Sequence, residues 1–350
     1  MPRGGTPEMP LPPIRGHDAA RATLSRLLAD PRGPATVLLT GPRGSGKTRV
    51  ALWAAQANVC PSITESGPCG HCDLCHRATR MSHPDLHYYV PHGALGGGSE
   101  RAQRERYTDL RAEVIEGLRD GERSALRPMG DRYSIGVIRL IRQEVTRRAW
   151  HTEGRRSLVI DHCDALRDPV VQNALLKLLE EPPEGLRVFM TASSAGVLLD
   201  TIQSRVIEYT VPPLTDEEMQ AVAADHQLPA TDSPRFRGRP GRLLDHYTPE
   251  TQAALERARS WIEAILDGDR HAIASICRDA PIADNDGSVA ATLRNATDLV
   301  LAEYPEHSAS LVPLLQRALQ ALQVKVQAGL ALSEMFIRSG RAVHRPAQDG

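Results

Sequence analysis

Gly-Pro-Arg-Gly-Ser-Gly-Lys-Thr at residues 41–48 is the stretch that decides the fold of this chain. An apolar run at residues 35–40 precedes it, and a helix-like segment at residues 49–56 follows it. This order of strand, glycine-rich loop and helix predicts a P-loop, whose backbone N–H groups cradle phosphate oxygens at a helix N-terminus. A glycine-rich turn that matches by chance is the alternative, and the correct flanking segments argue against it.

The P-loop supplies the candidate nucleotide-binding residues. Lys47 would reach the β- and γ-phosphates, and Thr48 would coordinate Mg²⁺. Lysine occurs only at positions 47, 177 and 325 of a chain that otherwise uses arginine, which argues against an accidental match. The other candidate contacts in this loop are Gly41, Arg43, Gly44, Ser45 and Gly46.

Length and composition limit the possible classes of protein. A chain of 350 residues is long enough for two or three domains, and its formal net charge of −1 argues against a protein that coats nucleic acid by itself. No stretch of about twenty apolar residues is present to span a membrane. Residues 1–13 are rich in Pro and Gly and lack the apolar core of a signal peptide, so we expect a flexible arm and a cytoplasmic protein.

Four of the six cysteines gather in one short segment, as Cys60, Cys69, Cys72 and Cys75. Two Cys-x-x-Cys steps that share Cys72, with a fourth cysteine nearby, can give four thiolates to a tetrahedral Zn²⁺. His71 is a competing ligand, although Cys72 fits the spacing better. Four closed ligands leave no open position for catalysis, so we predict a structural zinc module at residues 60–75, with two disulfides or free thiols as the alternatives.

A second strand ends in an acidic residue, where residues 157–161 read Ser-Leu-Val-Ile-Asp. A buried strand that ends in Asp has the form of a Walker B element, whose carboxylate holds Mg²⁺ through water. Together with strands expected at 86–90 and 186–193 and with the helices between them, this alternation predicts a parallel sheet covered on both faces.

Two further segments of the first half are less decisive. Residues 14–28 carry apolar residues at helical spacing, and the helix is either an ordinary amphipathic helix or one beside an adenine pocket. Residues 91–133 contain a glycine run and a segment of mixed charge, which predicts a partly helical surface insertion. Its arginines form either a solvated face, which we favour, or a DNA contact.

The last third of the chain is expected to be helical. Thr215, with Glu218 three residues later, forms a capping box that begins a small helical lid at residues 212–248. Residues 249–340 contain five segments with helical periodicity, and residues 341–350 form a polar tail.

These motifs resemble the clamp-loader branch of the AAA+ ATPases of bacterial DNA polymerase III. The resemblance covers residues 14–245 and depends on the P-loop, the cysteine module, the helix at residues 173–183 that ends in Glu-Glu-Pro-Pro, and Thr-Ile-Gln-Ser-Arg-Val at residues 201–206. It implies an α/β fold: an AAA+ P-loop domain at 14–211 with a zinc module, a helical lid, and an all-α collar at 249–340. The collar would join sister subunits, although a plain helical bundle explains the same periodicity.

The resemblance also implies roles for individual residues. Asp161 would support the metal, and Ser193, ahead of Thr191, lies where the family carries the sensor 1 residue. Arg205 matches the family's arginine finger, which reaches from its own subunit into the ATP site of the neighbour. The alternative is an ordinary surface arginine held in a salt bridge.

Departures from the family pattern favour a subunit that binds ATP or ADP but hydrolyses it poorly. His162 stands where hydrolysing subunits carry the catalytic Glu, and Gly241 stands where they carry the sensor 2 arginine. The implied partners are the gamma/tau and delta subunits, the sliding clamp and primer-template DNA in the assembled complex. The alternatives are a gamma/tau-type ATPase with its own turnover and an unrelated P-loop kinase or nucleotide switch.

Overall fold

The computed structural model describes residues 14–30, 33–93, 95, 97–119, 130–146, 155–229, 236–282, 284, 288–324 and 326–343. The expected arm at 1–13 and most of the expected tail lie outside this range. The described chain divides into two compact units, residues 1–243 and 244–350.

The first unit is built on a parallel sheet in the order β2-β3-β4-β1-β5. Its strands are β1 (Thr36–Thr40), β2 (Leu86–Tyr89), β3 (Arg156–Ile160), β4 (Leu186–Thr191) and β5 (Ile207–Thr210). Its helices are α1 (Asp18–Ala29), α2 (Lys47–Val59), α3 (Asp73–Thr79), α4 (Glu100–Arg119), α5 (Ile135–Val145), α6 (Pro169–Glu180), α7 (Asp200–Gln203), α8 (Asp216–Asp225) and the start of α10 (Pro240–His246). The predicted parallel sheet is therefore confirmed, and β5 is a strand that the sequence analysis missed.

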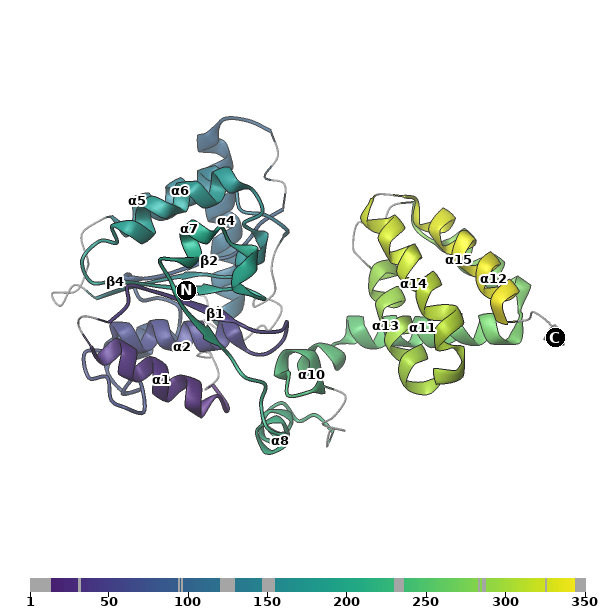
Figure 1. Cartoon of the computed structure of the whole chain (residues 1–350), viewed down its shortest axis with the longest axis horizontal. Helices are drawn as coiled ribbons and strands as arrows, with labels where there is room; N and C mark the ends of the chain where they lie inside the picture. Colours follow the sequence, from purple (N-terminus) through teal and green to yellow (C-terminus); the bar gives the residue numbers. More distant parts are fainter. Residues whose placement is uncertain are drawn as a thin grey trace, which may run out of the picture. The chain divides into compact units, whose positions relative to one another are not determined.

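Helices cover both faces of the sheet (Figure 1). Since side chains alternate along a strand, Val37 and Leu39 of β1 pack with α1 and α2, whereas Leu38 packs with α5 and α6 on the other face. Both faces of β1, β3 and β4 are buried, which explains their nearly continuous apolar sequences. The carboxyl ends of these strands lie at one edge, where the P-loop follows β1 and Asp161 follows β3.

The prediction of a surface insertion at 91–133 is wrong for α4, although the segment is partly helical as expected. Tyr107, Val114 and Leu118 of α4 are at most 3% exposed and belong to the core of the unit. Most charged residues of α4 lie on its outer face, and this mixed charge is why the sequence favoured a solvated surface despite apolar residues at helical spacing. Residues 94, 96 and 120–129 of the segment lie outside the described part of the chain.

The second unit is helical. It contains α11 (Pro249–Asp267), α12 (Arg270–Asp279), α13 (Ser288–Glu303), α14 (Ser308–Gln323) and α15 (Ala328–Val343). Its core includes Trp261 of α11 and Phe336 of α15, whose rings meet edge to face with centroids 6.1 Å apart. Helix α14 contributes Leu311 and Leu315 to this core.

Candidate functional site: the P-loop, its carboxylate and the cysteine cluster

The P-loop joins β1 to the first turn of α2. Gly44 and Gly46 have φ angles of 83° and 94°, a region that side chains other than glycine rarely adopt. A Cβ atom at Gly46 would lie 2.7 Å from Nε2 of His17, so this glycine also permits a close approach of the α1 N-terminus. The loop therefore has the backbone shape that a phosphate cradle requires.

Lys47 points its ammonium group into this loop. Its Nζ donates to the carbonyl oxygens of Gly41 and Pro42, at 2.7 and 3.0 Å. Burial lowers the pKa of Lys47, while the negative charges of Asp164 and Asp161 oppose that shift. The lysine is thus held beside the loop, where it can neutralise bound phosphate.

The other loop residues differ in exposure. Arg43 is exposed, and Ser45 is buried with a hydroxyl that has no hydrogen-bond partner among the described residues. Arg43 can therefore approach a bound anion from outside the loop, whereas the buried Ser45 hydroxyl is left for a ligand to satisfy.

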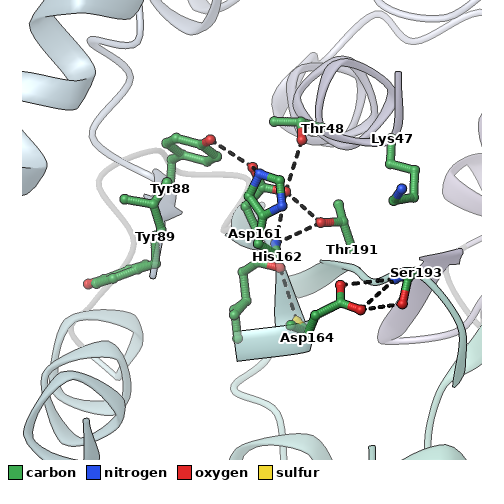
Figure 2. A network of polar contacts seen from close by, with 12 residues as sticks. Lys47, Thr48, Tyr88, Tyr89, Asp161, His162, Asp164, Thr191 and Ser193 are labelled. Atoms are coloured by element: carbon green, nitrogen blue, oxygen red, sulfur yellow. Dashed lines mark hydrogen bonds and ion pairs between the residues drawn. The ribbon is translucent and has the colours of Figure 1, made fainter. Parts of the chain in front are cut away.

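Asp161 lies at the centre of a polar network at the end of β3 (Figure 2). Its Oδ1 accepts from the Thr48 hydroxyl at 3.0 Å, from the backbone N–H of His162 at 3.1 Å, and from the Thr191 hydroxyl. Its Oδ2 accepts from the Tyr88 hydroxyl at 2.9 Å and lies 3.5 Å from Nε2 of His162. Asp161 is fully buried, and its contact with Thr48 joins the end of β3 to the first turn of α2.

The residues around Asp161 fit the Mg²⁺ ion that the resemblance implies. A carboxylate offers about four lone-pair sites, two on each oxygen, and three of the donors share Oδ1 while Tyr88 donates to Oδ2. Oδ2 therefore keeps an acceptor position for a metal-bound water, and Thr48 keeps the lone pairs of its hydroxyl. Thr48 and Asp161 would hold the ion, which would neutralise phosphate charge.

The two candidates for the sensor 1 position have different partners. The hydroxyl of Thr191 donates to Asp161, whereas the hydroxyl and the backbone N–H of Ser193 donate to Asp164. Of the two candidates, Thr191 therefore contacts the Walker B residue Asp161 directly, whereas Ser193 contacts the neighbouring carboxylate of Asp164. Tyr88 and Asp164 are members of this network that the sequence analysis did not single out.

The start of α10 packs directly on the P-loop. The backbone N–H of Gly241 donates to the carbonyl oxygen of Gly44 at 2.8 Å, and a Cβ atom at Gly241 would lie 2.8 Å from the Gly44 Cα. A side chain at the sensor 2 position would therefore push α10 away from the loop.

Two contacts join α8 to the segment just before α1, which lies beside the P-loop. The predicted capping box is confirmed, and Glu218 of that box also accepts from the backbone N–H of His17 at 3.1 Å. Arg15 forms an ion pair with Asp225 at the end of α8. These contacts hold α8 against the segment that leads into α1.

Arg205 follows α7 and is partly exposed. Its guanidinium donates to the carbonyl oxygen of Thr201 at 2.7 Å and forms an ion pair with Glu180 at 2.8 Å. Their side chains are 36% and 46% exposed. Within the chain, Arg205 is therefore held at the end of α6 by the salt bridge that we considered as the alternative to a finger.

The four predicted metal ligands come together beside α3. The Sγ atoms of Cys60, Cys69, Cys72 and Cys75 all lie within 4.8 Å of one another, and none of these cysteines is in a disulfide. Four sulfurs about 2.3 Å from a tetrahedral Zn²⁺ would be about 3.8 Å apart. The Sγ atoms of Cys69 and Cys75 are 3.9 Å apart, so the cluster could hold a zinc-sized ion.

Backbone N–H groups donate hydrogen bonds to two of the four sulfur atoms. The backbone N–H of Cys75 donates to Cys72 Sγ at 3.3 Å, and the N–H of Cys69 donates to Cys60 Sγ at 3.4 Å. Hydrogen bonding, chiefly from the His71 backbone, lowers the pKa of Cys69 to about 6, whereas burial raises the pKa of Cys60 and Cys75. His71 instead directs its ring Nδ1 to the Cys69 carbonyl oxygen at 2.9 Å.

We expect the purified protein to contain roughly one zinc ion per chain, measured by elemental analysis. The variant C75S should lose most of this metal. The control variant C277S, which changes a cysteine of the second unit, should retain it. Because binding must release protons from the buried thiols, metal retention should fall as the pH falls. Folded protein that contains no zinc after purification without chelators would contradict the ligand assignment.

The sheet, the P-loop and the buried acid after β3 define a P-loop protein of the AAA+ fold class. A family model described as "DNA polymerase III, delta subunit" matches residues 16–215. The chain therefore belongs to this family of DNA polymerase III clamp-loader subunits.

Relatives of two kinds share this region. The chain is 26% identical over 211 residues to the DNA polymerase III subunit gamma/tau of Mycobacterium tuberculosis H37Rv, which covers 60% of this chain and 30% of the relative. It is 25% identical over 225 residues to the DNA polymerase III subunit delta' of Bacillus subtilis 168, which covers 64% of this chain and 53% of the relative. The chain thus spans between about a third and a half of the length of these relatives.

A solved structure shows the same fold. The gamma subunit-related protein of DNA polymerase III from Thermotoga maritima has a TM-score of 0.52 and 15% identity, over 93% of this chain and 100% of that one. No described helix of the present chain has the length and apolar character needed to traverse a lipid bilayer.

Proposed function

We propose that this chain is a delta-prime-type subunit of the bacterial replicative clamp loader. In this role it binds ATP or ADP at its P-loop, hydrolyses it slowly or not at all, and supplies Arg205 to a neighbouring ATPase subunit. The complex would then load the sliding clamp onto primed DNA. Membership of the clamp-loader family and the similarity to delta' and gamma/tau relatives support the assembly.

The single observation that carries the choice of subunit is the position of His162. Hydrolysis requires a base that orients the attacking water, and a Glu in this position normally does so. Here the backbone N–H of His162 donates to Asp161 and to the Thr191 hydroxyl, and its Nε2 lies 3.5 Å from Asp161. The ring is therefore turned toward the Walker B carboxylate, which supports slow hydrolysis.

The remaining residues support phosphate binding without turnover. The P-loop N–H groups can donate hydrogen bonds to phosphate oxygens, and Lys47 supplies a positive charge at the loop. Gly241 brings the α10 backbone onto Gly44 but adds no cationic group there. These residues hold the phosphates, while the group that would accelerate their cleavage has been replaced.

The proposal is tested by the nucleotide chemistry of the isolated chain. We expect calorimetry to show binding of ADP or ATP, and K47A to weaken that binding by about tenfold or more. K177A, which changes another of the three lysines, is the matched control and should bind like the wild type. Rapid ATP hydrolysis by the isolated chain would instead favour a gamma/tau-type ATPase.

A further inference from the structure

Asp164 is a second carboxylate beside the P-loop, and the proposed function does not use it. It lies in a single turn of 3₁₀ helix at residues 163–165, just after β3, and is partly exposed. The hydroxyl and the backbone N–H of Ser193 both donate to it, which holds the carboxylate at the end of β4 (Figure 2). Asp161 would support Mg²⁺, so the presence of Asp164 needs a separate explanation.

A short series of hydrogen bonds connects Asp164 to the P-loop lysine. The carbonyl oxygen of Ser193 accepts from the backbone N–H of Gly41 at 3.3 Å, and the Gly41 carbonyl oxygen accepts from Nζ of Lys47 at 2.7 Å. Burial lowers the pKa of Lys47, and the charge of Asp164 opposes this shift more than the charge of Asp161 does. Asp164 therefore acts on the cation that would neutralise bound phosphate.

A third phosphate would bring negative charge to the same part of the site. In a P-loop the lysine reaches the β- and γ-phosphates, so ATP would place near Lys47 a γ-phosphate that ADP lacks. That phosphate would have to share the ammonium with Asp164. Repulsion between two like charges in a partly exposed site costs on the order of tenfold in binding.

Ser193 does not offset this repulsion. A serine hydroxyl has one hydrogen, and Ser193 donates it to Asp164. If the hydroxyl turned to a γ-phosphate, Asp164 would lose that donor while it faced a second anion. If the hydroxyl stayed on Asp164, the phosphate would gain no donor from it. Both arrangements favour a nucleotide without a γ-phosphate.

We infer that this P-loop binds a nucleoside diphosphate more tightly than the corresponding triphosphate, because the Asp164 carboxylate repels the γ-phosphate. This inference rests on the proposed function, since it names the nucleotide that the same site holds. It also agrees with slow hydrolysis, because a chain that retains ADP has no γ-phosphate to cleave.

The test is a calorimetric titration of the full chain with ADP and with ATP, both in excess Mg²⁺. We expect ADP to bind about tenfold more tightly, and this ratio to fall toward about threefold in about 0.5 M salt, since salt screens partly exposed charges. Equal affinities, or tighter binding of ATP, would overturn the inference, while the proposed binding of nucleotide would stand. Absence of binding by either nucleotide would overturn both proposals.

A matched pair of variants connects the preference to Asp164. D164N removes the charge but keeps an oxygen that can accept from Ser193, so its affinity for ATP should rise about tenfold, to the level of ADP. D200N changes an exposed carboxylate on α7 and should keep the wild-type preference. An unchanged preference for ADP in D164N, with thermal unfolding similar to that of D200N, would contradict the role of Asp164. A wild-type preference that does not narrow in salt would contradict it too, and that measurement requires no variant to fold.

Discussion

R205A is expected to slow ATP hydrolysis by the assembled clamp loader by about a thousandfold or more, and to leave nucleotide binding by the isolated chain unchanged. A guanidinium that enters a neighbour's site meets the negative charge that spreads over the transferred phosphoryl oxygens, and the loss of such a finger has effects of this size. The measurement is DNA-stimulated hydrolysis by the complex reconstituted with gamma/tau and delta subunits, compared with the isolated chain.

The ion pair with Glu180 does not oppose this role. Arg205 and Glu180 are both partly exposed, and exposed pairs contribute only about 0–1 kcal/mol. The guanidinium can therefore leave Glu180 for a triphosphate at little cost. Glu180 keeps the side chain at the end of α6 when no neighbour is present.

Two variants serve as controls for R205A. R139A removes another surface arginine in a 2.8 Å ion pair, with Glu100, and should leave hydrolysis by the complex unchanged. E180Q removes the partner of Arg205 and should not lower the rate, because the finger itself remains. Full hydrolysis by a complex that contains R205A would show that Arg205 is only a surface ion-pair residue.

The sequence predicted the parts of this fold whose patterns are local. The P-loop requires glycines, a lysine and flanking elements within a few residues of one another, and the structure confirms the strand and helix around it. The four cysteines likewise lie within sixteen positions, and they gather as their spacing predicts. Whether zinc occupies them stays a prediction.

Features that depend on tertiary packing could not be predicted. Ile207 is 46% exposed at the start of β5, an edge strand too short and too polar to show a β pattern. Tyr88 and Tyr89 are adjacent tyrosines with similar propensities, yet one reaches Asp161 and the other Glu144. The position of β2 in the sheet decides which of the two tyrosines lies on the face toward Asp161.

The packing of α4 is another consequence of such tertiary contacts. Arg111 of α4 donates to Glu144 of α5 at 2.9 Å and to the backbone carbonyl oxygen of Tyr88 at 2.8 Å. Its guanidinium also lies 4.2 Å from the ring centroid of Tyr89. The side chains of Arg111 and Glu144 are 13% and 19% exposed, so this pair is largely shielded from water.

The pKa of Glu144 reflects these contacts. Burial alone would raise it, but the hydrogen bond with His87, the charge of Arg111 and the Tyr89 hydroxyl outweigh burial and lower the pKa from 4.5 to about 2. Since the folded value is depressed, the contribution of Glu144 to stability is complete above about pH 5 and is lost as the pH falls toward 2.

We therefore expect R111A to lower the free energy of unfolding by about 3 kcal/mol at neutral pH, because it leaves the Glu144 carboxylate buried without its cation. The pKa of Glu144 should rise in this variant, so acid unfolding should begin at a higher pH than in the wild type. Urea unfolding at neutral pH and the pH dependence of its midpoint measure the two effects.

The control lies on the same helix. Arg101 forms an i,i+4 pair with Glu105 at 3.0 Å, but its side chain is 89% exposed, so R101A should cost less than about 0.5 kcal/mol. Equal losses in R111A and R101A would mean that α4 is held by its apolar face alone. A larger loss in R111A, with an earlier acid transition, would show that the buried ion pair joins α4 to β2 and α5, next to the strand that carries Tyr88 to Asp161.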